Sequence, residues 1–335
     1  MFGESSIALP PGRIFAHYDS SQNSPSLSRL ALDLLEQQKA VWPQLSAGYL
    51  ALEYVRRREL HGEGFSVCLQ FNPQRAVSSG AKVDTQSIKA RPCFLCMENL
   101  PPLQRAITYR DEFLVLCNPA PIFAQHYTIA HLRHRPQALA ENLRSFLELV
   151  KDFSPYFSIF YNGPKCGASA PDHHHFQAYP AGAIPVETQI HEAARRILVK
   201  NVLGVSLHKI QNLGRKIILL TGLDQEAMIS ALLRVIAATQ QAMSSAGEPM
   251  MNVICSFHDG LYQVLIFPRR KHRPEVYFHT GADRVLISPA SVDMGGLIVT
   301  PIEKDFLSVD AQLVASIYRE VSVTPETIYR TISLL

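Results

Sequence analysis

Apolar residues recur at helical spacing in several parts of the chain. From Ser24 to about Leu60 they return every three to four positions, which predicts mostly helix, interrupted at Pro43. The same spacing covers residues 136–150 and 224–247. A further helical stretch is expected after Pro185, to about Val202.

Short alternating or continuous apolar runs lie between these stretches and predict strands. They occupy residues 65–71, 113–116, 127–130, 157–161, 173–179 and 217–220. Residues 251–256 and 261–267 flank Asp259-Gly260, a pair typical of a tight hairpin turn. The segment 72–91 is polar and rich in Ser, Gly and Lys, which predicts a surface loop.

A short motif occurs twice and bears on whether the chain contains an internal duplication. Predicted strands lead into Arg133-His-Arg-Pro-Gln137 and again into Lys271-His-Arg-Pro-Glu275. One interpretation is a duplication, with two similar α+β halves in one chain. The other is coincidence in basic loops that follow strands, and the motif alone favours neither.

Composition narrows the function classes. The chain has 335 residues, of which 47% are hydrophobic and 18% charged, so it can bury a substantial core and is not a disordered chain. The net charge of +3 is too small to indicate nucleic-acid or membrane binding by bulk electrostatics. Its apolar runs are too short to span a bilayer, and its N-terminus lacks a signal-peptide pattern. We therefore expect a cytoplasmic protein.

Histidines concentrate where we expect chemistry. Six of the thirteen lie between residues 126 and 175. If residues 173–179 form a strand, His173, His175 and Gln177 share one face, while His174 lies on the other. Two imidazoles and a carboxamide on one face indicate a site. The alternatives are a metal-binding histidine tract or a solvated loop.

This face suits phosphoryl chemistry. A neutral imidazole is nucleophilic near neutral pH, and an adjacent amide can donate a hydrogen bond to a phosphate oxygen without adding charge. The preceding loop contains Gly163, Gly167 and Ser169, whose backbone N–H groups and hydroxyl allow close approach of a phosphate.

The six cysteines do not form a disulfide framework in a chain without an export signal, and only Cys93 and Cys96 are close in sequence. A lone CxxC is compatible with redox chemistry, metal binding or coincidence. A zinc site needs two more ligands, and nearby histidines can supply them. Our hypothesis is a Cys2His2 site made of Cys93, Cys96, His134 and His173.

Together, Cys93-Phe-Leu-Cys96, the loop from Asn162 to Ser169, and His173-His-His175-Phe-Gln177 resemble the galactose-1-phosphate uridylyltransferase branch of the histidine-triad superfamily, which includes nucleotide phosphorylases. The resemblance covers roughly residues 65–180. It implies an α+β fold of two histidine-triad-like halves, with antiparallel sheets flanked by helices and joined into one duplicated unit. The implied division is an N-terminal helical segment (1–64), a catalytic half (65–205) and a degenerate second half (206–335).

The resemblance also implies a role for individual residues. His175 corresponds to the nucleophile and Gln177 to the amide that binds the transferred phosphate. The implied substrate-binding residues are Asn162, Gly167 and Ser169, which cradle phosphates, and Asn118, which contacts the nucleoside. Cys93, Cys96, His134 and His173 correspond to the ligands of a structural zinc ion.

The implied activity is nucleotidyl transfer or phosphorolysis through a nucleotidyl-His175 intermediate. A nucleotide-sugar or dinucleoside polyphosphate would donate the nucleotide, and phosphate or a sugar phosphate would accept it. The alternatives are a hydrolase of the same superfamily, which Gln177 disfavours because typical hydrolases carry a third histidine there, and a non-catalytic, zinc-stabilised nucleotide-binding protein. Relatives often pair, so a homodimer is an option.

The sequence departs from the family pattern at two positions. Asp172 is inserted before His173, and His174 replaces a proline between the two family histidines. Because of these departures, the resemblance does not identify the substrate. Arg75, Arg91 and the basic residues of 269–271 are candidates to neutralise phosphate charge, although we expect a surface role for most of them.

Overall fold

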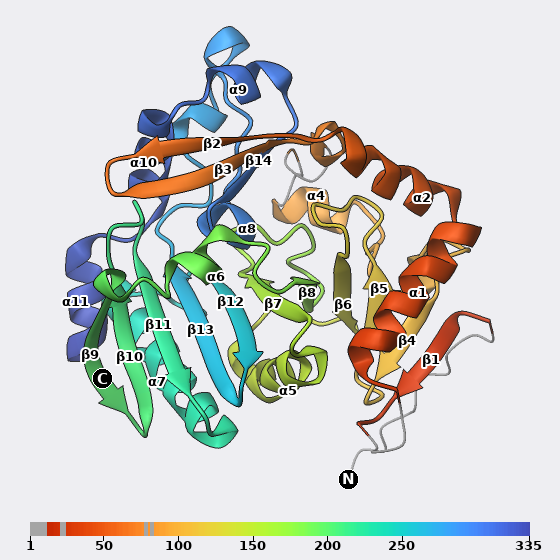
Figure 1. Ribbon diagram of the computed structural model, residues 1–335, viewed down its shortest axis with the longest axis horizontal. Helices are drawn as coiled ribbons and strands as arrows, with labels where there is room; N and C mark the ends of the chain where they lie inside the picture. The colour runs from red at the N-terminus through yellow and green to blue at the C-terminus, as the bar shows by residue number, and fades with distance from the viewer. Residues whose placement is uncertain (1–11, 21–24, 77–79, 81–83) are drawn as a thin grey trace.

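The structure is a computed structural model that describes residues 12–20, 25–76, 80 and 84–335 (Figure 1). Its strands are β1 (Ile14–Tyr18), β2 (Arg56–Gly62), β3 (Phe65–Phe71), β4 (Ala106–Tyr109), β5 (Phe113–Cys117), β6 (Tyr127–His131), β7 (Phe157–Asn162), β8 (His175–Pro180), β9 (Arg196–Val202), β10 (Val205–Ile210), β11 (Ile217–Gly222), β12 (Met251–His258), β13 (Leu261–Pro268) and β14 (Leu297–Thr300). Its α-helices are α1 (Leu27–Val41), α2 (Pro43–Leu50), α4 (Thr85–Lys89), α5 (Leu143–Phe153), α6 (Pro185–Gln189), α7 (Gln225–Met243), α8 (Ser291–Met294), α9 (Glu303–Ser308), α10 (Ala311–Val321) and α11 (Pro325–Ser333).

One large sheet forms the centre of the molecule. Within the described residues it has eleven strands in the order β1-β4-β5-β6-β8-β7-β12-β13-β11-β10-β9. The middle pair, β7 and β12, is antiparallel. Outward from this pair, the order β7-β8-β6-β5-β4 on one side matches β12-β13-β11-β10-β9 on the other. Helix α5 connects β6 to β7, and α7 connects β11 to β12, so the two arrangements repeat along the chain (Figure 1).

The predicted α+β fold with two similar halves is therefore confirmed, and the sheets of the two halves are continuous. We call residues 106–180 the first half and residues 196–268 the second half. The His-Arg-Pro motif does not reflect this duplication. Residues 133–137 follow β6, whose counterpart is β11, whereas residues 271–275 follow β13, whose counterpart is β8. The domain boundaries at 64/65 and 205/206 stay predictions, because the shared sheet offers no break that tests them.

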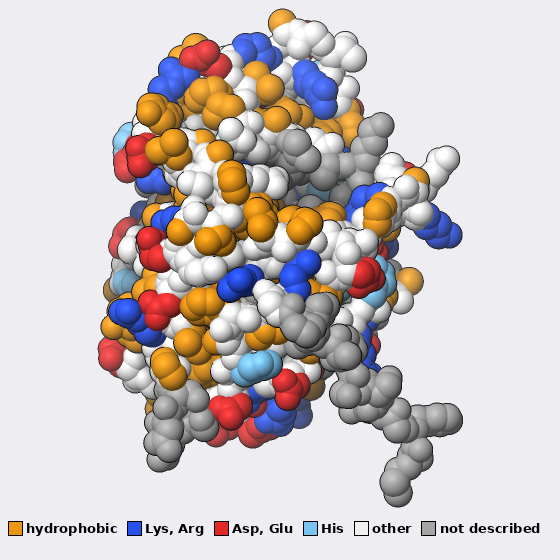
Figure 2. Space-filling view, turned by 90° about the vertical axis from the view of Figure 1, so that its right-hand side faces the viewer, with side chains coloured by type: hydrophobic (Ala, Val, Ile, Leu, Met, Phe, Trp, Pro, Cys, Tyr) orange, Lys and Arg blue, Asp and Glu red, His pale blue; other side chains and the backbone are white. Residues whose placement is uncertain are grey.

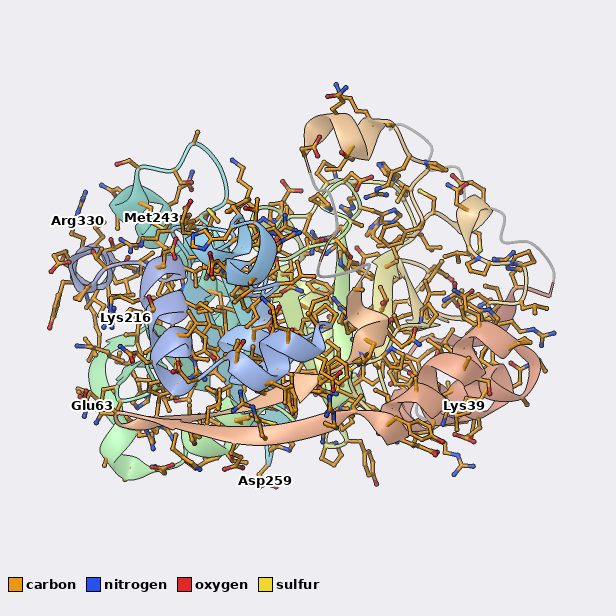
Figure 3. The ribbon with its side chains drawn as sticks, turned by 90° about the horizontal axis from the view of Figure 1, so that it is seen from above. Lys39, Glu63, Lys216, Met243, Asp259 and Arg330 are labelled. Carbon is orange, nitrogen blue, oxygen red and sulfur yellow. The ribbon has the colours of Figure 1, made fainter. Side chains whose placement is uncertain are left out.

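Apolar layers cover both faces of the large sheet. On one face, α1, α5 and α7 bury apolar stripes, such as Phe146, Leu147 and Val150 of α5, against the strands. On the other face lies a second sheet of order β14-β3-β2, with α9 and α10 beside it. Seen from above, the β2–β3 hairpin runs along one side, with Glu63 and Lys216 near one end and Lys39 of α1 near the other (Figure 3).

The exposed surface agrees with the small net charge. The face drawn in Figure 2 mixes basic and acidic side chains among polar and apolar ones. Along the described part of the chain, every helix is either too short or too polar to cross a bilayer.

Two local predictions were wrong. The helix expected after Pro185 is only the short α6, and residues 196–202 form β9, because Ile197, Val199 and Val202 favour an extended backbone and β10 supplies a partner. The N-terminal helical stretch ends before β2, which pairs with β3.

Ser24 lies outside the described residues, and the side chain of Ser26 caps α1. The loop predicted at 72–91 contains, where it is described, a 3-10 turn (Pro73–Arg75) and α4.

Candidate active site and metal centre

Strand β8 separates the histidines onto two faces, as its alternation predicts. His175 and Gln177 line a cavity on the face that the smaller sheet covers. His174 points to the opposite face, where its ring packs edge-on against Phe176 with centroids 4.7 Å apart. β8 pairs with both β6 and β7, so its two cavity-facing side chains are held on a strand with neighbours on each side.

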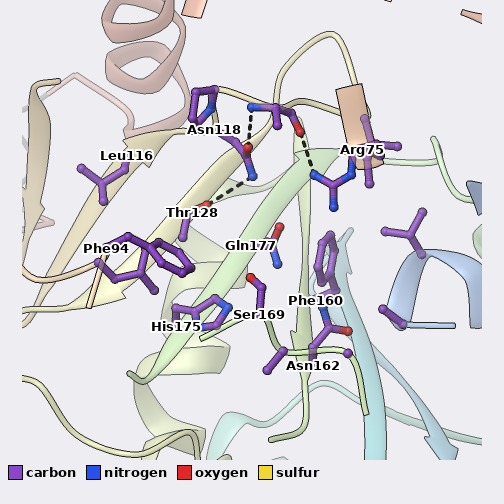
Figure 4. Close-up of a pocket in the computed structure, with 18 of the residues that line it drawn as sticks. Arg75, Phe94, Leu116, Asn118, Thr128, Phe160, Asn162, Ser169, His175 and Gln177 are labelled. Atoms are coloured by element: carbon purple, nitrogen blue, oxygen red, sulfur yellow. Dashed lines mark hydrogen bonds between the residues drawn. The ribbon is translucent and has the colours of Figure 1, made fainter. Parts of the chain in front are cut away.

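The cavity has a volume of about 660 Å³, within the range of ligand pockets. The predicted substrate-binding residues Asn118, Asn162, Gly167 and Ser169 all line it together with His175 and Gln177 (Figure 4). Gly167 has φ +111°, and a Cβ there would lie 2.5 Å from that of Ala290, so this position requires glycine. The site thus gathers residues from β5, β7, β8 and the loop between β7 and β8.

The tautomer of His175 follows from one hydrogen bond. Its Nδ1 lies 2.8 Å from the carbonyl oxygen of His173. A carbonyl only accepts, so Nδ1 carries the proton and Nε2 keeps its lone pair. Burial lowers the pKa of His175 to about 4, which favours the neutral ring. Gln137 braces the strand here, since its amide donates to the carbonyl of His175 and accepts from its backbone N–H.

Gln177 is oriented by His126, the residue directly before β6. The backbone N–H of Ile122 donates to Nδ1 of His126, so the proton of the neutral ring is on Nε2. That Nε2 lies 2.9 Å from Oε1 of Gln177 and donates to it. The amide oxygen is therefore engaged, and the amide NH2 of Gln177 faces the cavity. Burial lowers the pKa of His126 to about 3, which keeps this arrangement neutral.

The predicted metal ligands come together as a separate cluster. The ligand atoms of Cys93, Cys96, His134 and His173 all lie within 4.8 Å of one another. The Sγ of Cys93 is 3.2 Å from Nδ1 of His173, and the Sγ of Cys96 is 3.2 Å from Nδ1 of His134. Two thiols and two imidazoles at such distances form a donor set that fits a tetrahedral zinc ion.

Hydrogen bonds from neighbouring groups orient the side chains of this cluster. Nε2 of His173 donates to the carbonyl of His131 at 2.7 Å, which leaves Nδ1 free as a ligand. Asp172, the inserted residue, lies with its carboxylate 3.9 Å from Nε2 of His134 and accepts a hydrogen bond from Arg91. Arg91 also donates to the carbonyl of Ser169, so this region links the metal cluster to the phosphate loop.

We expected a surface role for most of the basic candidates, and this is wrong for Arg269, which is fully buried. Arg75 and Arg91 are partly exposed and line the cavity. Arg75 donates to the carbonyl of Ala120, and its guanidinium lies beside the site in Figure 4. Burial lowers the pKa of Arg75 to about 10, which still leaves it charged at neutral pH.

Several residues that line the cavity or hold its lining side chains in place carried no functional prediction. His126 and Gln137 orient the two central side chains, and Phe94 and Phe160 provide aromatic walls. Arg273, together with other residues after β13, closes the far side. His126 had one signal, since it begins the strand that precedes the histidine-rich segment, whereas the position of Gln137 depends on contacts between distant segments.

Comparisons with known proteins show which folds this chain is similar to. A family described as a domain of unknown function, DUF4922, matches residues 34–180, which is less than half of the chain. No curated protein matches. Among solved structures, yeast Ap4A phosphorylase Apa2 matches with a TM-score of 0.54 and 15% identity, over 86% of this chain and 97% of that one. Apa2 in complex with Ap4A matches with a TM-score of 0.58 and 14% identity, over 89% of this chain and 98% of that one.

A structure of Apa2 with AMP is similar to the same degree, with a TM-score of 0.54 and 16% identity, over 86% of this chain and 96% of that one. At these identities the likeness concerns the fold. It extends over nearly the whole of Apa2, so both halves of the present chain have counterparts there.

Proposed function

We propose that this chain transfers a nucleotide to phosphate or a sugar phosphate through His175. The proposal starts from its duplicated fold, which is that of the uridylyltransferase and phosphorylase branch of the histidine-triad superfamily. The observation that supports this most is the joint exposure of two groups to one cavity. These groups are the unprotonated Nε2 of His175 and the amide NH2 of Gln177.

The proposed reaction has two displacements. In the first, the Nε2 lone pair of His175 forms an N–P bond to the α-phosphorus of the donor, while the P–O bond to the leaving group breaks and the leaving phosphate takes that electron pair. In the second, an oxygen of the acceptor phosphate forms a P–O bond to the same phosphorus, and the electron pair of the N–P bond returns to Nε2.

The protein stabilises these steps by placing neutral donors and cations around the phosphate. The Gln177 amide and the Ser169 hydroxyl donate to non-bridging oxygens. Arg75 adds positive charge at the edge of the site. A neutral amide beside the nucleophile stabilises the phosphorane-like transition state without an ion pair that would hold the intermediate too tightly.

A dinucleoside polyphosphate is our first candidate donor, because the similar Apa2 structures contain Ap4A and AMP. A nucleotide-sugar is the second candidate. Asn118 at the end of β5 accepts a hydrogen bond from the backbone N–H of Ala120 and donates to the hydroxyl of Thr128, which positions it to contact a ribose. The Cys2His2 cluster would hold zinc in a structural role, because four protein ligands leave no open coordination position.

The test is covalent labelling. The protein is incubated with Ap4A or a nucleoside diphosphate sugar labelled at the α-phosphorus, without acceptor, and protein-bound label is measured after denaturation. We expect an acid-labile, base-stable label that disappears in His175→Ala. His208→Ala, on β10 of the second half, is the matched control and should label normally.

The acceptor decides the reaction class. Chasing the label with inorganic phosphate or a sugar phosphate should release a nucleoside diphosphate or a nucleotide-sugar. Release by water alone at the same rate would favour the hydrolase alternative. If none of the donors labels the wild-type protein, the covalent mechanism is wrong.

A further inference from the structure

The polarity of Asn162, at the end of β7, is determined by residues outside the first half. Its Oδ1 accepts from the backbone N–H of Ser291 at 2.8 Å and from Nδ2 of Asn252 at 2.9 Å. A backbone N–H can only donate, so the atom facing it must be the amide oxygen. The amide NH2 of Asn162 is then the group left for the cavity that this residue lines (Figure 4).

The polarity of Asn252 is determined in the same way. Nη1 of Arg269 lies 2.5 Å from Oδ1 of Asn252, and Nδ2 of Asn252 lies 2.7 Å from the carbonyl oxygen of Cys166. A guanidinium only donates and a carbonyl only accepts. Asn252 therefore has its oxygen toward Arg269 and both N–H groups toward Cys166 and Asn162.

Arg269 anchors this chain of hydrogen bonds from a fully buried position directly after β13. Besides Asn252, its guanidinium donates to the carbonyls of Pro289, Lys271 and His272. These carbonyls belong to the segments that close the far side of the cavity. One buried cation thus holds both the wall of the cavity and the amide that orients Asn162.

From this geometry we infer that Asn252, held by Arg269, is a positioning residue that, together with the backbone N–H of Ser291, makes Asn162 present an N–H donor to the substrate phosphate. The inference rests on the proposed function and deepens it. The first half orients one amide, Gln177, through His126, and the second half orients the other, Asn162, through Asn252. Asn252 and Asn162 lie directly opposite each other on the central strand pair, so the junction of the two halves creates this link.

The experiment is a double-mutant cycle on ligand binding. Asn252→Asp keeps an acceptor for Arg269 and nearly the same volume, but it has no N–H for Asn162 or Cys166. Binding of AMP, UMP and inorganic pyrophosphate is measured by calorimetry at equal zinc content. We expect Asn252→Asp to weaken binding of the preferred ligand by about 10-fold or more. In the Asn162→Ala background the same change should alter binding by less than about 2-fold.

A buried control separates positioning from general loss of stability. Thr239→Val removes a buried hydrogen bond to the carbonyl of Val235 in α7, on the opposite face of the sheet. It should lower the urea midpoint without weakening ligand binding. Rescue of the midpoint of Asn252→Asp by a stabilising co-solute should leave its binding defect in place.

The outcomes also separate this inference from the proposed function. If the Asn252 effect is the same with and without the Asn162 side chain, Asn252 acts elsewhere and the inference is wrong. If the cycle shows coupling but no donor labels His175, the inference stands and the proposed transfer is wrong. If none of the three ligands binds the wild type, the inference is wrong, and the labelling of His175 by a donor decides the proposed function separately.

Discussion

The two halves of the central sheet share one topology but carry different chemistry. Strand β8 of the first half bears His175 and Gln177, whereas its counterpart β13, Leu261–Pro268, contains no histidine. The Cys2His2 cluster found among the described residues takes His134 and His173 from the first half and Cys93 and Cys96 from the segment before it, and it includes no residue of the second half. The comparison teaches that the fold supplies a frame, while the chemistry depends on a few side chains placed on one strand of it.

The second half still takes part in the site. Asn252 of β12 contacts Asn162 of β7, and the segment that directly follows the second half lines the cavity. The second half has kept a supporting role at the junction without a nucleophile of its own. The following predictions test this division, beginning with the largest expected effect.

Replacing the proposed nucleophile should abolish the transfer that we propose for the first half. His175→Asn is expected to lower turnover of the best donor by about 10⁴-fold or more, because His175 is the imidazole that β8 places on the same face as Gln177, and asparagine cannot form the N–P bond. Steady-state assays measure this loss. The same substitution at His208 in the second half should change turnover by less than about 2-fold, and an equal loss there would contradict the division.

Removing the metal should loosen the first half more than the second. Cys93→Ser is expected to abolish the proposed zinc binding and to lower the unfolding free energy by several kcal/mol, because metal binding contributes directly to folding. Metal analysis and hydrogen exchange measure the two effects, with faster exchange in β5 and β6 than in β11 and β13. Cys255→Ser, at a buried cysteine of β12 outside the cluster, should retain zinc.

Replacing the Gln177 amide with a carboxylate should lower turnover by an intermediate amount. Gln177→Glu puts a carboxylate where the NH2 faces the phosphate, and we expect turnover to fall by about 10²- to 10³-fold. The kinetic measurement is paired with Gln263→Glu on β13, the corresponding strand of the second half. A similar loss in that control would show that the charge acts nonspecifically.

The smallest expected effect concerns pH. The folded-state pKa of His126 is about 3, below its usual value near 6.5, so the unfolded state binds the extra proton between these values. Stability is therefore greatest above about pH 6.5 and falls with acidification, by at most about 1.4 kcal/mol per pH unit from this group. His126→Gln should flatten the dependence.

Urea unfolding near neutral pH and in mild acid measures that slope. His208→Gln, at a half-buried position of the second half, should flatten it less, and the exposed His61 serves as the control. An unchanged slope in His126→Gln would contradict the buried neutral ring that orients Gln177.

The sequence predicted those parts of the fold and site that depend on local spacing. Alternation in β8 predicted that His175 and Gln177 share a face, and a hairpin at Asp259-Gly260 follows from two residues with positive φ. Local patterns misled where the partner decided the conformation. Residues 196–202 have helical-looking spacing, yet they form β9 because β10 offers hydrogen bonds.

The basic residues show that local sequence also fails to predict whether a charged side chain is buried. Arg75 and Arg269 read as ordinary surface residues in sequence, because nothing local marks a buried guanidinium. In the structure Arg75 lines the cavity and Arg269 has carbonyl and amide oxygens around it from four different segments. Burial of a charged group depends on partners that are distant along the chain.

By itself the sequence determined the mixture of helices and strands, the paired thiols of Cys93 and Cys96, and a strand with an imidazole and an amide two residues apart, while the duplication was implied by the resemblance to the histidine-triad superfamily. Side-chain alternation and short motifs are local properties of the backbone, so they survive without knowledge of the partners. The tertiary structure alone decided that His126 holds Gln177 and that Asn252 lies opposite Asn162. Those contacts depend on strand register, which the packing of the whole core sets.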